Sequence, residues 1–251
     1  MKIKTDMIAV GLFDVHLEPE KEEFHPAYAA VREFVLDIRP DIVMIMGDWG
    51  EFASLSNWNK AKPLIAEGKR YKDDAEVCLD ELYFLKNSLP DTEFHFVKGN
   101  HEERAKWYVQ KNPEMEGFID LESDLMLYDL CETVTEFEDY FQLGELAWTH
   151  GWFWNMYHAA KTMREFVGNV VYGHVHHFQQ DSKNQHFKKK EYISQAVGCL
   201  TDRYPEWKGN KPTRFQNGFA VCEYRSNGHF TLHPIAVING AFSYGGYTWK
   251  G

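Results

Sequence analysis

The chain places polar side chains directly after a short apolar run at five points. The five groups are Asp14-Val15-His16, Gly47-Asp48, Gly99-Asn100-His101-Glu102, His150-Gly151 and Gly173-His174-Val175-His176. Imidazole nitrogens, carboxylate oxygens and amide oxygens together are the donor atoms that Zn, Mn, Fe, Co or Ni take in proteins. Too few carboxylates are present for a calcium site, which is built from oxygen atoms. The residue types therefore indicate transition-metal chemistry.

Seven of these side chains are candidate metal ligands: Asp14, His16, Asp48, Asn100, His150, His174 and His176. Seven exceed what one ion takes while it keeps a position open, whereas two ions that share a bridging carboxylate would use them all. Two-metal sites hold their ions roughly 3.5–4 Å apart and clamp a phosphoryl group during its displacement. The two carboxylates and a bridging hydroxide would leave the pair of divalent ions with net positive charge. That charge favours an anionic substrate such as a phosphate ester.

Each group alone also has a structural interpretation. A single His at a strand end is often only hydrogen-bonded, and Asp14 or Asp48 could cap a helix that follows a strand. The occurrence of all five groups at successive strand ends favours the metal site. A glycine beside most of these residues would let the backbone turn sharply there.

Apolar periodicity predicts the elements that must position these groups. Short apolar runs predict strands at residues 8–13, 146–149 and 170–172, and the continuous run at 42–46 predicts a strand covered on both faces. The apolar alternation at residues 93–97 predicts a further strand. Spacing of three and four residues predicts amphipathic helices, at residues 26–38, 72–87 and about 155–167. Because ligands bind at the carboxyl ends of strands in α/β sheets, the five groups should share one edge.

The rest of the chain predicts further helix and then mostly strand. Residues 103–131 look helical and polar with a break at Pro113, and residues 133–143 could hold short strands. Residues 177–194, 217–225 and 229–238 alternate in polarity and lack helical spacing. We expect one α/β domain over residues 1–251, in which an α/β half precedes a half dominated by strands.

Composition limits the kinds of binding partner and the cellular compartment that we expect. The net charge of −11 argues against a general nucleic-acid-binding surface, although it leaves room for a local basic cleft. The four cysteines are widely spaced and form no CxxC pair, so we expect them to be reduced core residues. The N-terminus lacks the apolar segment of a signal peptide, and no apolar run approaches the length of a membrane span. These features predict a cytoplasmic protein without a membrane partner.

In order, the motifs DxH, GD, GNHE, H and GHxH resemble those of the calcineurin-like metallophosphoesterases, from Asp14 to His176. The segment VGCLTDRYPEWKGNKPTRFQNGFAV, residues 197–221, is also similar to phage-encoded members of that superfamily. The resemblance implies an α/β fold, a four-layer αββα sandwich in which two mixed β-sheets are flanked by helices.

The resemblance also implies a role for each candidate residue. One metal ion would bind Asp14, His16, Asp48 and His176, and a second would bind Asp48, Asn100, His150 and His174, so that Asp48 bridges the two. Manganese is the first expectation, with Fe, Zn, Ni or Co as alternatives. His101 would be the catalytic histidine, which either donates a proton to the leaving oxygen or steadies the transition state.

The expected activity is hydrolysis of a phosphodiester by attack of a metal-bridging hydroxide. Monoesterases usually add arginine clamps, and here Lys98 and Arg104 are the nearest cationic side chains. The alternatives are a DNA or RNA nuclease, a phosphomonoesterase and a non-catalytic scaffold. The sequence Gly47-Asp48-Trp49-Gly50-Glu51 lacks the Asp-Arg-Gly continuation of the Ser/Thr protein phosphatases, and His16 stands where lariat-debranching relatives carry Cys.

Several neighbouring residues keep two interpretations. Glu102 could support a ligand or be a solvated acid at a helix start, and His177 should face away from the cluster. The aromatic side chains Trp152, Phe153, Trp154 and Tyr157 could stack on a nucleobase, although core packing is the more frequent role. The loop with Arg203, Lys208, Lys211 and Arg214 could contact a substrate anion or be plain surface. The run Lys188-Lys189-Lys190 should be a solvated strand end.

Overall fold

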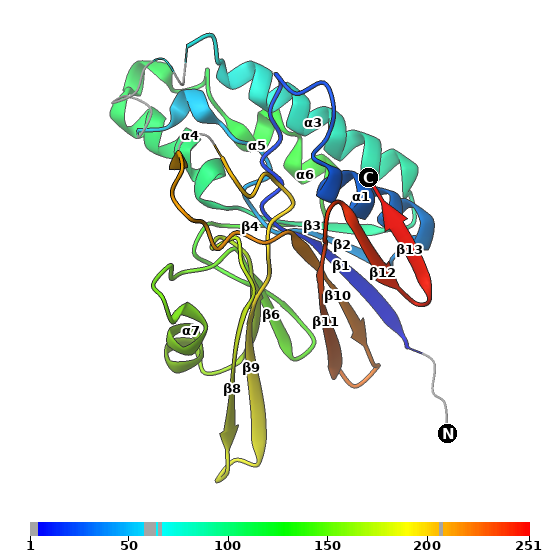
Figure 1. The fold of residues 1–251 in the computed structure, drawn as a ribbon. Helices are drawn as coiled ribbons and strands as arrows, with labels where there is room; N and C mark the ends of the chain where they lie inside the picture. The colour runs from blue at the N-terminus through cyan, green and yellow to red at the C-terminus, as the bar shows by residue number, and fades with distance from the viewer. Residues whose placement is uncertain (1–4, 58–63, 65–66, 206–207) are drawn as a thin grey trace.

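The computed structural model describes residues 5–57, 64, 67–205 and 208–251 (Figure 1). Its larger sheet has six strands in the order β11-β10-β1-β2-β3-β4. Their bounds are β1 (Met7–Leu12), β2 (Ile42–Ile45), β3 (Glu93–Val97), β4 (Thr133–Thr135), β10 (Gly218–Tyr224) and β11 (Phe230–Ala236). The strands β1 to β4 pair in parallel, whereas β10 pairs antiparallel with both β1 and β11. The sheet is therefore mixed.

The second sheet has five strands in the order β5-β6-β7-β9-β8. Their bounds are β5 (Phe141–Leu143), β6 (Leu146–Thr149), β7 (Asn169–Tyr172), β8 (Gln179–Gln185) and β9 (Lys190–Ala196). The strands β6, β7 and β9 pair in parallel, and the edge strands β5 and β8 pair antiparallel with their neighbours. This sheet is mixed as well.

Helices cover the outer face of the larger sheet. They are α1 (Pro26–Ile38), η1 (Ala53–Leu55), α3 (Tyr71–Ser88), α4 (Asn100–Lys111), η3 (Pro113–Met115), α5 (Leu121–Asp124) and α6 (Leu127–Leu130). A hairpin of β12 (Ala241–Tyr244) and β13 (Tyr247–Lys250) packs against α1, where the Phe34 and Trp249 rings lie 4.8 Å apart. Pro26 stands in the first turn of α1, where its fixed φ suits the helix and its missing N–H costs nothing.

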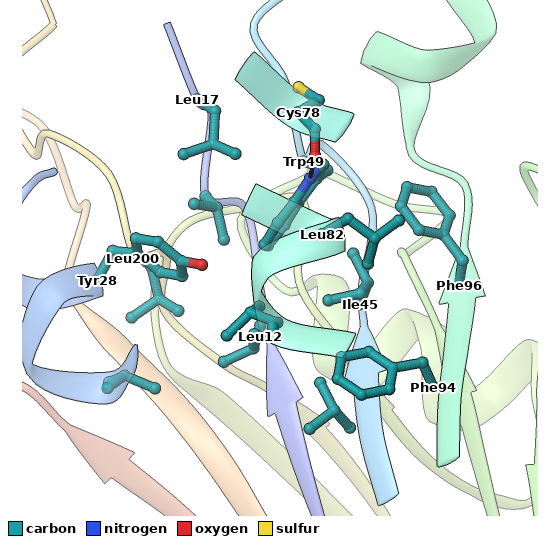
Figure 2. Close-up of a cluster of buried hydrophobic side chains, with 14 of the residues drawn as sticks. Leu12, Leu17, Tyr28, Ile45, Trp49, Cys78, Leu82, Phe94, Phe96 and Leu200 are labelled. Atoms are coloured by element: carbon teal, nitrogen blue, oxygen red, sulfur yellow. Dashed lines mark hydrogen bonds between the residues drawn. The ribbon is translucent and has the colours of Figure 1, made fainter. Parts of the chain in front are cut away.

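The core under these helices uses one face of each parallel strand. Figure 2 shows Leu12 of β1, Ile45 of β2 and Phe94 of β3 facing Leu82 of α3. Trp49 lies fully buried in this layer, and its indole N–H donates a hydrogen bond of 3.0 Å to the carbonyl of Cys78 (Figure 2). Because the site begins one residue before Trp49, this packing fixes the backbone that carries Asp48.

Alternate residues of the same strands face the second sheet. Ala9 and Met44 of the larger sheet pack with Trp148 and Val171 of the second sheet in a separate core. The opposite face of the second sheet packs toward α7 (His158–Phe166), which contacts β8 and β9. The chain thus has four layers, helix, sheet, sheet and helix, which confirms the predicted αββα sandwich (Figure 1).

Most predicted elements agree with the structure within two residues at each end. The predicted helix over about 155–167 is wrong in its first turn, because Tyr157 has φ −116° and ψ 44°, which are not helical angles. Met156, expected on the apolar face of that helix, instead lies in the preceding loop and is exposed. The hairpin β12–β13 was not predicted. All four cysteines are buried and free, as expected.

Among the described residues, none of the helices has both the length and the apolar character that crossing a lipid bilayer would require.

Candidate metal centre

The seven candidate ligands come from both sheets and meet at one edge. Asp14 and His16 follow β1, Asp48 follows β2, and Asn100 is the first residue of α4 after β3. The other three follow strands of the second sheet: His150, His174 and His176. The structure therefore brings together every residue that the sequence singled out as a ligand.

The first group joins three loops. The Nε2 atom of His16 lies 3.3 Å from Nε2 of His176 and 3.7 Å from Oδ2 of Asp48. The Nε2 atom of His176 lies 3.3 Å from Oδ1 of Asp14. One ligand atom from each of these four residues lies within 4.8 Å of the others, and all four residues are buried. This group could hold a metal ion.

The second group lies on the other side of Asp48. The Nε2 atom of His150 lies 3.5 Å from Oδ1 of Asp48, 3.1 Å from Oδ1 of Asn100 and 3.2 Å from Nδ1 of His174. Asp48, His150 and His174 also satisfy the 4.8 Å criterion, so this group could hold a metal ion as well. Asp48 thus faces the first group with Oδ2 and the second group with Oδ1.

At the second group, atoms with lone pairs face one another without a proton between them, which is an arrangement that a cation can stabilise. The Nδ1 atom of His150 lies 3.0 Å from the carbonyl oxygen of Met46, which can only accept, so Nδ1 carries the proton. The neutral ring therefore presents a lone pair at Nε2 toward the Asn100 oxygen. Burial alone would lower the pKa of His150, but the carboxylates of Asp48 and Asp14 raise it. The Nε2 position is thus one that a proton or a metal ion stabilises.

Burial and charge also shape the pKa values of Asp14 and His174. Burial alone would raise the pKa of Asp14, yet the charge and hydrogen bond of His176 hold it at about 2. Burial and the neighbouring His150 lower the pKa of His174 to about 4. Asp14 is therefore a carboxylate and His174 a neutral imidazole near neutral pH, which are the forms that ligate metal.

The backbone at the site is strained. Five of the seven candidates have a left-handed backbone, which non-glycine residues rarely adopt. They are Asp14 (φ 49°), His16 (φ 51°), Asp48 (φ 48°), His174 (φ 68°) and His176 (φ 58°). Such residues cost on the order of 1–3 kcal/mol each and persist where the surrounding structure enforces them, often at functional sites.

Two glycines are required by close approach. A Cβ atom on Gly99 would lie 2.3 Å from Oδ1 of Asp48, and one on Gly173 would lie 2.2 Å from Oδ2 of Asp14. Neither distance is compatible with a side chain. The sharp turn that the sequence suggested is therefore not the reason for these two glycines; they make room for the carboxylates.

Glu102 is a buried support of the Asp48 loop. Its carboxylate accepts hydrogen bonds from the backbone N–H groups of Asp48 (2.8 Å), Trp49 (2.8 Å) and Gly99 (2.7 Å). The alternative of a solvated acid at the helix start is wrong, since Glu102 is only 2% exposed. Burial and the Asp48 carboxylate raise the pKa of Glu102.

Glu51 is a functional candidate that the sequence analysis missed. Its Oε2 atom lies 2.8 Å from Nδ1 of His16, so His16 donates there and keeps the Nε2 lone pair for the first group. One ligand atom each from His16, Glu51 and His101 also lie within 4.8 Å of one another. The signal that could have revealed Glu51 is its place three residues after Asp48 on the same loop.

His101 lies beside the ligands but is held by other partners. Its Nε2 atom is 3.7 Å from Oδ2 of Asp48 and only 2.6 Å from Nη2 of Arg104. Arginine has only donors, so Nε2 accepts from Arg104, and Nδ1 donates to the backbone oxygen of Glu51 at 2.9 Å. Burial and the Arg104 charge lower the pKa of His101 well below its usual value.

The two neighbouring cations differ in their surroundings. Lys98 is buried and bonded to Glu122 (2.6 Å) and Glu136 (2.7 Å), so its charge is neutralised. Arg104 instead contacts His101 and donates to the backbone oxygen of Glu51 at 2.5 Å. Of the two cations that the sequence suggested, only Arg104 contacts His101.

The other residues that the sequence analysis singled out lie outside the two ligand groups. His177 bonds His158 at 3.0 Å and the oxygen of Val175 at 2.9 Å, away from the ligands, as expected. The lysines at 188–190 are exposed at the turn between β8 and β9, also as expected. Trp154 and Tyr157 are exposed rather than packed in the core.

No family model matches the chain. The "Gene 54 protein" of Mycobacterium phage D29 is 24% identical over 237 residues, which cover 88% of this chain and 91% of the relative. The "Gene 54 protein" of Mycobacterium phage L5 is 23% identical over 239 residues, with the same coverage. Neither name states an activity. Among solved structures, GAP50, "the anchor in the inner membrane complex of Plasmodium", covers 98% of this chain and 89% of its own at 13% identity and a TM-score of 0.36.

Proposed function

We propose that the chain is a dinuclear metal-dependent phosphodiesterase of the calcineurin-like metallophosphoesterase kind. The observation that carries the proposal is the Asp48 carboxylate, whose two oxygens lie 3.7 Å from Nε2 of His16 and 3.5 Å from Nε2 of His150. One carboxylate shared by two groups of imidazole and carboxylate donors is an arrangement that can hold two adjacent cations.

The seven candidate ligands divide into two sets, one for each proposed ion. Asp14, His16 and His176 would complete the first site, and Asn100, His150 and His174 the second, with Asp48 common to both. When bound, two divalent ions would supply positive charge to the phosphoryl oxygens and lower the pKa of the attacking water. Manganese is the first ion to test, with Fe, Zn, Ni and Co as alternatives.

His101 and Arg104 supply the second part of the chemistry. With Nε2 accepting from Arg104, His101 has no proton to offer in that direction. The pair therefore favours the second of the two roles expected for His101, in which it steadies the transition state. We propose that it does so by orienting the guanidinium toward the phosphoryl oxygens. Proton donation by His101 would require that it first exchange Arg104 for the leaving oxygen.

The surrounding charges favour a diester over a monoester. A dianionic monoester is usually held by several free cations, whereas Lys98 is occupied by two carboxylates. Arg104 is the cation that contacts His101, and part of its charge is balanced by Glu51, whose Oε1 lies 3.6 Å from its Nη1. A monoanionic diester matches this smaller positive charge better.

The test compares two ester classes on metal-loaded protein. Bis(p-nitrophenyl) phosphate should be hydrolysed with a higher kcat/KM than p-nitrophenyl phosphate, and Asp48→Asn should abolish both activities. Asp80→Asn, at an exposed position of α3, is the matched control and should leave both unchanged. Two bound ions without hydrolysis of either ester would favour the scaffold alternative, and a monoester preference would overturn the diesterase assignment.

Replacing His101 tests its role separately. His101→Ala should keep both ions and lose activity equally toward an ester with a p-nitrophenolate leaving group and one with an alkoxide leaving group. A proton donor would show the opposite pattern, a much larger loss with the poor leaving group, because general acid help is typically worth about 10²–10⁴-fold there. That pattern would restore the proton-donor role.

A further inference from the structure

The loop between His150 and α7 exposes three apolar side chains, and one of them, Trp154, lies beside the second ligand group. Trp154 is 78% exposed, Met156 is 56% exposed and Tyr157 is 70% exposed. Core packing, which the sequence favoured, holds for Trp152, whose ring stacks on Phe166 at 5.2 Å. Apolar side chains gathered at a functional edge and left in water are typical of a binding surface.

Trp154 reaches the rim of the candidate metal centre. Its ring centroid lies 6.1 Å from that of His174, with the two ring planes at 69°. A group attached to a phosphate held between the two metal groups would therefore pass close to the indole face. A flat apolar ring is the partner that such a face binds best, by stacking.

The described parts of the basic segment 202–216, residues 202–205 and 208–216, are anchored beside the first ligand group. The segment contains Arg203, Lys208, Lys211 and Arg214 against two acidic residues, in a chain whose net charge is −11. The loop is fixed at both ends: the N–H of Leu200 donates to the oxygens of Phe13 (3.0 Å) and Asp14 (3.1 Å), and the N–H of Gln216 donates to that of His176 (2.7 Å). Both ends of the segment are thus anchored to the loops that carry Asp14 and His176.

Two of these cations lie near the ligand His176. The Phe215 ring lies 4.5 Å from the ring of His176, and Nζ of Lys208 lies 3.7 Å from the centroid of Phe215. Arg214 directly precedes Phe215 in the chain, so it belongs to the same part of the loop. The two flanks of the centre therefore differ: one is aromatic and one is cationic.

From these two flanks we infer that the chain binds single-stranded nucleic acid across the metal centre. An unpaired base stacks on Trp154, and phosphates next to the scissile one contact Lys208 and Arg214. The inference rests on the proposed function and names its substrate class. Hydrolysis consumes one water, breaks one P–O bond of an internal diester, and leaves a terminal phosphomonoester and a hydroxyl that takes the proton.

Single strands fit this edge better than duplexes. Stacking on an aromatic side chain requires an unpaired base, and it tolerates any sequence because every base has an apolar face. The cations are confined to one loop, whereas duplex binding uses many phosphate contacts along the helix. The acidic remainder of the chain repels phosphates elsewhere and confines the strand to this edge.

The test measures binding to the Mn-loaded protein by fluorescence anisotropy. The probes are a labelled six-nucleotide single strand with slowly hydrolysed phosphorothioate linkages, an abasic strand with the same linkages, and a duplex of the same sequence. The single strand should bind roughly tenfold more tightly than the abasic strand, within the range for one stacked base. It should also bind more tightly than the duplex.

The variants assign the preference to the two flanks. Trp154→Ala should remove the preference for bases, and Trp154→Phe should keep most of it. Tyr128→Ala, which removes an aromatic side chain of α6 that is 70% exposed, is the control and should change nothing. The double variant Lys208→Ala/Arg214→Ala should weaken the base-bearing and abasic strands equally and flatten the salt dependence.

The inference fails if the wild-type protein binds both strands equally, if it prefers the duplex, or if Trp154→Ala keeps the base preference. Hydrolysis of bis(p-nitrophenyl) phosphate without a base preference would overturn this inference and leave the proposed function standing. A base preference that depends on Trp154, without hydrolysis of any diester, would support this binding mode and overturn the proposed function. Circular dichroism of each variant checks that it is folded.

Discussion

Replacing Glu102 by Gln tests how the Asp48 loop is held. The Oε2 atom of Glu102 accepts from the N–H groups of Asp48 and Gly99, and Oε1 accepts from that of Trp49. A glutamine can keep the first pair on its oxygen, but its amide nitrogen then faces the N–H of Trp49. A buried donor left without an acceptor costs about 1–3 kcal/mol.

The expected loss of stability follows from that cost. For a protein of roughly this size, each kcal/mol lowers the melting temperature by about 2–4 °C. Glu102→Gln should therefore lower the melting temperature by about 2–12 °C. Glu102→Ala leaves three donors without acceptors, so its loss should be larger, up to the extent that water enters the space.

Scanning calorimetry of the metal-free protein measures this effect, and metal titration measures its consequence at the site. Because Asp48 serves both groups, Glu102→Gln should weaken metal binding by about 10–100-fold, the usual effect of losing a partner that orients a ligand. Glu103→Gln is the control: Glu103 is the next residue of α4 and pairs only with the exposed Lys106 among the partners that the structure describes. An unchanged melting temperature in Glu102→Gln, or an equal drop in both variants, would refute the role given to the three hydrogen bonds.

Three further predictions concern the metal centre itself. Elemental analysis should find two ions per wild-type chain after loading with Mn. Asp48→Ala should disturb both sites, whereas His16→Ala should disturb mainly one. A wild-type stoichiometry of one ion would contradict the dinuclear assignment. Metal affinity should rise with pH through the raised pKa of His150, because the proton on Nε2 must leave before an ion binds there. The rise should reach up to about tenfold per pH unit for each proton released. Calorimetry in matched buffers that shows no pH dependence would count against this. Chelation should abolish activity and lower the melting temperature only by the binding linkage, since the two large apolar cores contain none of the candidate ligands. An unfolded metal-free chain by circular dichroism would mean that the ions are structural.

The sequence was informative where the physics is local. Short apolar runs indicated the strands β1, β2, β6 and β7, and each of these four strands is followed by a candidate ligand. Because parallel strands of one sheet share a carboxyl edge, that pattern was enough to expect that Asp14, Asp48 and Asn100 lie together. The approach of His176 to Asp14 needs the two sheets to pack on each other, which the pattern does not specify.

The sequence was uninformative where a side chain bonds to a residue far away in the chain, because hydrophobic periodicity does not specify such contacts. Glu51 reaches His16 because the backbone of the two loops pairs between Leu17 and Gly50, which no periodicity specifies. Lys98 looked available because its partners Glu122 and Glu136 lie far along the chain. The sequence does not show whether an aromatic residue such as Trp154 is buried or exposed, so only the structure revealed that it is exposed.

The division of the ligands between two sheets has a consequence for how the protein is made. His16 and His176 approach to 3.3 Å although 160 positions separate them, so neither ion site is complete until the second sheet has emerged from the ribosome and docked. A nascent chain that ends before residue 150 has none of the three histidines that the second sheet contributes. Under the proposed function, metal loading would therefore be a late event in biosynthesis, and a chain stalled before residue 150 would lack the proposed hydrolytic activity.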